Sequence, residues 1–228
     1  MADQNAAVRK YLTEMIGTFV FMFAVLGIVK SGTECVAAIA LGIGSVLMVM
    51  VYASGHISGG HLNPAVSIAA YLRGALPAGD LGPYIVAQLV GALAAFGVGI
   101  GLWHDSAKYP TTALDLSGNV WPAFLAELVF TFALCYVVLH TATSKDSAGN
   151  SFYGLAIGFV VTVGVVAVGG ISGGAFNPAI TFGLMLSGNF AWKFLWVYLL
   201  AQVIGAAVAA YAYKATSLDE HTAAARRG

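Results

Sequence analysis

The sequence predicts an all-α membrane protein with six transmembrane helices, two shorter helices that enter the membrane without crossing it, and an inverted internal repeat. Three observations support this fold class. Apolar residues make up 59% of the 228 residues and charged residues only 9%, whereas soluble domains contain about 25% charged residues. Six apolar stretches are long enough to span a bilayer. The second half of the chain also repeats motifs of the first.

The predicted spans follow one another with polar or turn-rich residues between them. In chain order they cover residues 11–29, 36–54, 81–103, 121–141, 152–169 and 192–213. The first span is expected to be retained, because the polar stretch 1–10 leads into it without a small-residue cleavage site.

Two further apolar helices are predicted from Asn63 to about Leu72 and from Asn177 to about Leu186. They are too short to cross a hydrocarbon core of about 30 Å and too apolar for surface loops. Each is therefore expected to form the helical half of a re-entrant segment.

The repeat has a constant offset. Asn177 follows Asn63 by 114 positions, and Gln202 follows Gln88 by the same number, within similar local sequences. The sequence thus predicts one transmembrane domain over 1–228, with repeat 1 at about 8–110, repeat 2 at about 119–214 and a polar tail at 215–228. Because each repeat holds three spans, the second enters the membrane in the opposite orientation, which defines an inverted repeat.

Lysine and arginine residues predict the orientation, because they concentrate in cytoplasmic loops. With both chain ends inside, seven of these residues are cytoplasmic and three are external. The cytoplasmic set is Arg9, Lys10, Arg73, Lys145, Lys214, Arg226 and Arg227, and the external set is Lys30, Lys108 and Lys193. This places the first half-helix on the cytoplasmic side and the second on the outer side. The short loops favour a bacterial plasma (inner) membrane.

Composition excludes several functions. The net charge is zero and the few charges lie mostly at segment ends, so the chain lacks the basic surface of a nucleic-acid-binding protein. Little sequence remains outside the spans for a separate enzymatic domain. Cys35 and Cys135 show no metal-type spacing, so no disulfide, metal or cofactor is predicted.

The most informative motif occurs twice. Asn63-Pro64-Ala65 and Asn177-Pro178-Ala179 each follow Ile-Ser-Gly-Gly and two further residues. Proline suits the first helical position, and the preceding asparagine suits the N-cap, with its amide NH₂ left free to donate into a lumen. Two half-helices entering from opposite faces bring their positive ends together near the midplane, where the combined field repels cations and protons.

With this duplicated motif in matching membrane halves, the sequence resembles the aquaporin, or major intrinsic protein, family over about residues 8–214. The resemblance implies a right-handed helical bundle, one pore per subunit and a homotetramer. It also implies a file of water and small neutral solutes moving past backbone carbonyls. By family analogy these carbonyls belong to Gly59, Gly60 and His61 in the first segment, and to Gly173, Gly174 and Ala175 in the second.

One position departs from the water-specific members of this family, which resemble one another in having arginine directly after the second Asn-Pro-Ala. Here that residue is Ile180. The other filter positions, carried over by alignment to the motifs, are Gly174, Val165 and Ile43. The resemblance therefore implies a wider, apolar filter that admits solutes beyond water, such as urea, ammonia, glycerol or arsenous acid.

Polar residues inside the spans have two interpretations. Glu14 and Glu127 are by default functional candidates, but their matching positions in the repeats favour a structural role, in which each accepts hydrogen bonds from a re-entrant loop. Gln88 and Gln202 are interpreted as contacts between helices. His56 and His61 allow a pH gate, although packing histidines fit the pattern better.

Two alternatives to a passive channel remain open from the sequence. An ion-coupled secondary transporter also combines inverted repeats with broken helices, and Glu14 and Glu127 are its candidate coupling residues. A structural membrane protein with a closed pore is the other.

Overall fold

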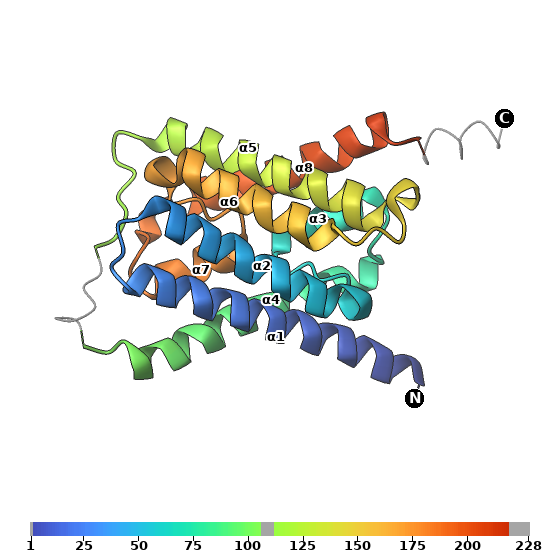
Figure 1. The fold of residues 1–228 in the computed structure, drawn as a ribbon, viewed down its shortest axis with the longest axis horizontal. Coiled ribbons are helices and arrows are strands. Elements are labelled where there is room, and N and C mark those ends of the chain that lie inside the picture. The colour runs from blue at the N-terminus through green and yellow to red at the C-terminus, as the bar shows by residue number, and fades with distance from the viewer. Residues whose placement is uncertain (1, 106–111, 219–228) are drawn as a thin grey trace.

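In the computed structural model, which describes residues 2–105 and 112–218, six long helices run along a common direction (Figure 1). They are α1 (Ala2–Lys30), α2 (Val36–Ser58), α4 (Ala78–Leu102), α5 (Val120–Val138), α6 (Tyr153–Ser172) and α8 (Leu195–Thr216). All six are long and apolar enough to cross a membrane. The six predicted spans are therefore confirmed as helices.

The helix ends differ from the prediction where apolar composition is a poor guide. α1 begins at Ala2 and not at Tyr11, because a helix of good helix-forming residues continues beyond the apolar border into polar sequence. α5 ends at Val138 and is followed by a π-helical turn, Leu139–Thr143. A 3₁₀ turn, Trp192–Phe194, precedes α8.

The two half-helices lie toward opposite ends of the bundle (Figure 1). α3 (Pro64–Arg73) has 10 residues and α7 (Pro178–Leu186) has 9. At about 1.5 Å per residue, each reaches roughly half of a 30 Å membrane core. α3 lies toward the end of the bundle at which α1 begins and α8 ends, here called the terminal end; the other end is called the far end.

The long helices pack in pairs that repeat between the two halves. α1 lies along α4 and α5 lies along α8, while α2 packs against its counterpart α6. Glycine permits the closest approaches. A Cβ on Gly91 of α4 would overlap the carbonyl oxygen of Met15 in α1, and one on Gly205 of α8 would lie 2.7 Å from the carbonyl oxygen of Leu128 in α5.

A connection at the far end holds two loops together. Leu114 forms a parallel bridge with Phe190, and the Lys193 ammonium lies 2.8 Å from the Asp115 carboxylate. Hydrogen bonds from Lys193 and from Ser117 lower the pKa of Asp115 to about 2. The exposed Asp115 carboxylate therefore stays charged at any pH well above 2.

Several residues of the orientation argument lie outside the described residues, namely Lys108, Arg226 and Arg227, together with residues 219–228 of the predicted tail. Of the described ones, Lys10 contacts Asp80 at the start of α4, and Arg73 donates to the carbonyl of Thr143. Both contacts lie at the terminal end. Lys193 lies at the far end.

We predict that Gly91→Ala destabilises the protein by about 1–3 kcal/mol, because the new methyl group has no room between α1 and α4. Thermal unfolding in detergent measures the change. Gly97→Ala is the matched control on the same helix, since nothing lies within 4 Å of its Cβ position. Equal melting temperatures for both variants would contradict the close packing described above.

Candidate functional site

Each re-entrant segment begins later than the motif suggests. α2 continues through His56 to Ser58, and α6 continues to Ser172. Gly59 and Gly173 then end these helices with φ of +89° and +86°, a left-handed conformation that glycine adopts at little cost. Only residues 59–63 and 173–177 are therefore non-helical, so the predicted irregular stretches are shorter than expected.

The two asparagines cap the half-helices and also join them. The side-chain oxygen of Asn63 accepts a hydrogen bond from Ala65 N at 2.8 Å, and that of Asn177 accepts one from Ala179 N at 2.9 Å. Each Nδ2 donates to the other segment, Asn63 to the Phe176 carbonyl and Asn177 to the Leu62 carbonyl, both at 2.9 Å. The sequence analysis expected both NH₂ groups to be free to donate into the lumen. In the structure they are only partly free, because one hydrogen of each bridges the two halves.

The residues that accept these bridging hydrogen bonds have a strained backbone. Leu62 and Phe176 have φ of +51° and +50°, values that are uncommon for bulky residues. Both side chains are fully buried. Leu62 packs on Gly17, and Phe176 packs on Gly164, so tight burial holds the strained conformation in place.

Glu14 and Glu127 each receive four hydrogen bonds and are completely buried. The donors to Glu14 are Ser58 Oγ, His61 N, Leu62 N and Gln88 Nε2, at 2.7 to 2.9 Å. Those to Glu127 are Ser172 Oγ, Ala175 N, Phe176 N and Gln202 Nε2, at 2.8 to 3.0 Å. Each carboxylate therefore holds one re-entrant segment to a long helix. This is the contact pattern that a structural role of Glu14 and Glu127 requires.

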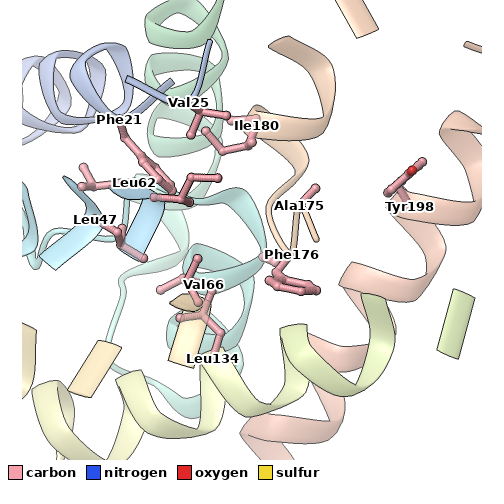
Figure 2. Close-up of a cluster of buried hydrophobic side chains, with 14 of the residues drawn as sticks. Phe21, Val25, Leu47, Leu62, Val66, Leu134, Ala175, Phe176, Ile180 and Tyr198 are labelled. Carbon is pink, nitrogen blue, oxygen red and sulfur yellow. The ribbon is translucent and has the colours of Figure 1, made fainter. Parts of the chain in front are cut away.

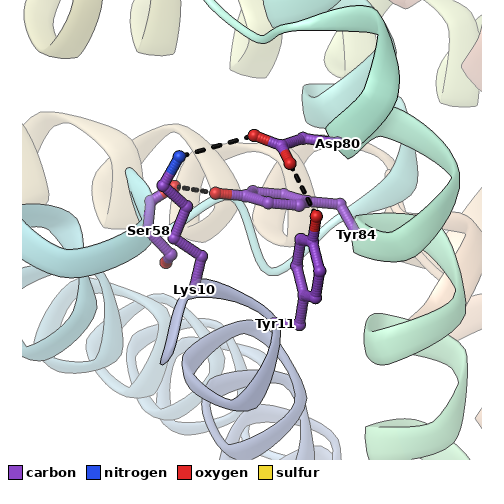
Figure 3. A network of polar contacts seen from close by, with 5 residues as sticks. All are labelled: Lys10, Tyr11, Ser58, Asp80 and Tyr84. Atoms are coloured by element: carbon purple, nitrogen blue, oxygen red, sulfur yellow. Dashed lines mark hydrogen bonds and ion pairs between the residues drawn. The ribbon is translucent and has the colours of Figure 1, made fainter. Parts of the chain in front are cut away.

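A tyrosine pair that the sequence analysis missed supports the same segments. Tyr84 Oη donates to the Ser58 carbonyl at 2.7 Å, and Tyr198 Oη donates to the Ser172 carbonyl at 2.6 Å. The constant offset of 114 relates Tyr84 to Tyr198 and was the available signal. Figure 3 shows Tyr84 beside Asp80, which accepts from Tyr11 at 2.6 Å and from Lys10 at 3.4 Å.

A narrow cavity of about 10 Å³ lies where the two segments meet. Its polar lining comes from Gly60, His61, Asn63, Ala175 and Asn177. Its apolar lining comes from Phe21, Leu47, Val66, Leu134, Val138, Ile157 and Val161. Figure 2 shows four of these apolar side chains, Phe21, Leu47, Val66 and Leu134, in one cluster with Leu62. The volume suits about one water molecule, so the lining has the form of a constriction with one polar and one apolar side.

Wider cavities lie on both sides of this constriction. At the terminal end, one of 290 Å³ includes His56 and Gly59, and another of 360 Å³ includes Gly59 and His61. At the far end, a cavity of 240 Å³, here called the outer chamber, includes Gly173, Gly174 and Ala175. All six residues predicted to present carbonyls therefore border the cavities or the constriction.

The four predicted filter residues come together in the outer chamber. Ile43, Val165, Gly174 and Ile180 all line it, although Ile43 and Val165 were placed only by spacing across helices. Their side chains offer no hydrogen-bonding group. The wall at this level is apolar on the side that faces the re-entrant backbone.

The two candidate histidines have different surroundings. His61 is buried, its Nδ1 lies 3.1 Å from Ser67 Oγ, and its ring packs against Tyr84 at 5.2 Å. His56 is exposed on α2. These contacts fit a packing role for His61. Within residues 2–105 and 112–218, no three His, Cys, Asp or Glu side chains gather as a metal site requires.

Comparisons with known proteins agree with this geometry. The family model described as Major intrinsic protein matches residues 1–216. The chain is 37% identical to "Probable aquaporin NIP7-1" of Arabidopsis thaliana, over 92% of this chain and 77% of the relative. It is 36% identical to "Glycerol uptake facilitator protein-like 6" of Lactiplantibacillus plantarum, over 89% and 95% of the two chains.

A solved structure has the same fold. The X-ray structure of the aquaglyceroporin from Plasmodium falciparum superposes with a TM-score of 0.81 at 27% identity, covering 92% of this chain and 96% of that one.

We predict that Glu14→Gln and Glu127→Gln each destabilise the protein by about 1–3 kcal/mol, because an amide NH₂ replaces one acceptor among four converging donors. Thermal unfolding in detergent measures the loss. Glu34→Gln is the control, since Glu34 is exposed in the loop before α2. A large loss of stability in only one of the two variants would contradict the equivalent roles of the two carboxylates.

Proposed function

This chain belongs to the major intrinsic protein family, and from that premise we propose that it is a passive transmembrane channel for water and small neutral solutes. The observation that carries the proposal is the meeting of two half-helices at a constriction between wider cavities. The relatives named as an aquaporin and a glycerol facilitator support it. Permeants pass without any covalent step.

The constriction is suited to neutral molecules that form hydrogen bonds. Asn63 and Asn177 each retain one amide hydrogen after bridging the halves. The residues before them offer carbonyl acceptors, and the opposite wall is apolar. A permeant in file then exchanges bulk water for these fixed partners on one side only, which keeps it from binding tightly.

Cation exclusion follows from the half-helices. The N-termini of α3 and α7 both point to the constriction, and each carries about half a positive charge from the aligned peptide dipoles. A cation that loses its hydration shell there meets two positive helix ends. We propose this field as the main barrier to ions, because Ile180 removes the charge that an arginine would supply at the filter.

The filter is proposed to be Ile43, Val165, Gly174 and Ile180. Without a charged side chain, and with glycine at 174, it leaves room for solutes larger than water. Urea, ammonia, glycerol and arsenous acid are the proposed candidates.

The transporter alternative is disfavoured by the surroundings of Glu14 and Glu127. A coupling carboxylate has to gain and lose a proton or an ion during each cycle. Both groups instead hold four donors within 3.0 Å and lie fully buried behind the re-entrant segments.

We also propose that the chain lies in a plasma membrane with both ends cytoplasmic. Its short loops favour the plasma membrane of a bacterium. The excess of Lys and Arg at the terminal end supports the orientation. Repeat 1 at about 8–110 and repeat 2 at about 119–214 would then form one domain. A homotetramer, with a pore in each subunit, is the proposed assembly, and the mass of the detergent-solubilised particle tests it.

We predict that proteoliposomes carrying this protein pass water and at least one of urea, glycerol or arsenous acid in osmotic-jump experiments. Ile180→Arg should lower solute flux by about tenfold or more, because each 1.4 kcal/mol added to the barrier costs a factor of ten. Ile43→Phe narrows the same chamber without adding charge, and Ile180→Leu is the conservative control.

Unchanged solute flux in both Ile180→Arg and Ile43→Phe would refute the filter assignment. Saturable uptake that collapses with the proton gradient would instead support a coupled transporter.

Two cysteines provide a test of orientation. Cys35 is exposed at the far end, whereas Cys135 is buried. We predict that a membrane-impermeant maleimide labels Cys35 in intact cells. Lys145→Cys in a Cys35→Ala background, at the terminal end, should be labelled only after the cells are permeabilised. The reverse pattern would show that the chain ends face outward.

A further inference from the structure

The outer chamber contains very few polar side chains. Among the described residues that line it, only Thr112 and Asn189 carry a side-chain oxygen or nitrogen. The four filter residues supply none. Any side-chain hydrogen bond from the described wall of this chamber to a solute therefore has to come from one of these two residues.

The backbone turn that carries Asn189 does not depend on an asparagine. Asn189 N and Phe190 N both donate to the Leu184 carbonyl, at 2.8 and 3.1 Å. In the first repeat, Ala75 N and Leu76 N donate to the Ala70 carbonyl at 2.8 and 3.2 Å. Each turn follows a glycine with positive φ, Gly188 and Gly74. The same turn thus forms with alanine, and the amide of Asn189 is an addition to it.

The position of Asn189 is nevertheless well fixed. Its backbone carbonyl accepts from Leu114 N at 2.7 Å, across the bridge between the two far-end loops. Its side-chain Oδ1 accepts from Ser187 Oγ at 3.3 Å. No described residue accepts a hydrogen bond from its Nδ2. The half-buried side chain therefore keeps two N–H donors for another partner.

A donor at this place complements the rest of the chamber. The carbonyls of Gly173 and Gly174 can only accept hydrogen bonds, and the filter side chains can do neither. Urea and glycerol carry oxygen atoms that lose hydration on entry, and an oxygen left without a donor raises the barrier.

We propose that Asn189 is a specificity-determining residue, whose Nδ2 donates to the carbonyl or hydroxyl oxygen of an uncharged solute such as urea or glycerol as it enters the filter. This inference rests on the proposed channel function. The neutral amide of Asn189 then supplies the hydrogen-bond donor that Ile180 lacks.

The test compares water, urea and glycerol permeability in proteoliposomes with wild type, Asn189→Ala and Asn189→Asp. We expect urea and glycerol permeability relative to water to fall about fivefold in both variants, the effect of one lost hydrogen bond of about 1 kcal/mol. Asn189→Ala should fold normally, because Ala75 occupies the equivalent turn. Asn189→Asp keeps the shape and the acceptor for Ser187 but removes the donors.

Asn119→Ala is the control, since Asn119 is exposed before α5, makes no side-chain capping hydrogen bond and does not line the outer chamber; its solute-to-water ratios should equal those of wild type. Wild-type ratios in Asn189→Ala would overturn the inference, and wild-type ratios in Asn189→Asp would show that Asn189 acts by shape and not by donation. Failure of the wild-type protein to pass any solute would instead refute the proposed function.

Discussion

Peptide groups at membrane depth have no water to bond, and the need to give them partners governs this structure. Helices meet that need internally, but residues 59–63 and 173–177 do not form helices. Glu14 and Glu127 each supply acceptors for two backbone N–H groups of one segment, and Asn63 and Asn177 supply donors for two of the carbonyls. Once side chains from α1, from α5 and from the re-entrant segments themselves meet these demands, the backbone is free to face a cavity on its other side.

The same demand explains the positions of small residues elsewhere. A carboxylate on α1 reaches the first segment only if α1, α4 and the segment lie close together. Gly91 lets α4 approach Met15, and Gly17 leaves room for the Leu62 side chain. The second half repeats this at Gly205, while Phe176 finds its space at Gly164 of α6. The halves thus meet one requirement with slightly different packing.

Much of this arrangement could be predicted from the sequence. Apolar length identified the six spans, and the repeated Asn-Pro-Ala identified both half-helices, because proline and asparagine have strong positional preferences at helix starts. The end of α2 at Ser58 and the bridging role of the asparagine amides could not be read in this way. They depend on which glycine first takes a left-handed conformation and on contacts between segments more than 100 residues apart. Asn189 was also missed, because its importance comes from its difference from Ala75 in an otherwise identical turn.

The reciprocal bonds of Asn63 to Phe176 and of Asn177 to Leu62 have a consequence for biogenesis. The ribosome delivers the first three spans to the membrane before the second re-entrant segment exists. Until then Asn63 lacks its acceptor and the Leu62 carbonyl lacks its donor. The first half alone is therefore an incomplete structure, and the bridge at the centre of the bilayer can form only after the second re-entrant segment has entered the membrane.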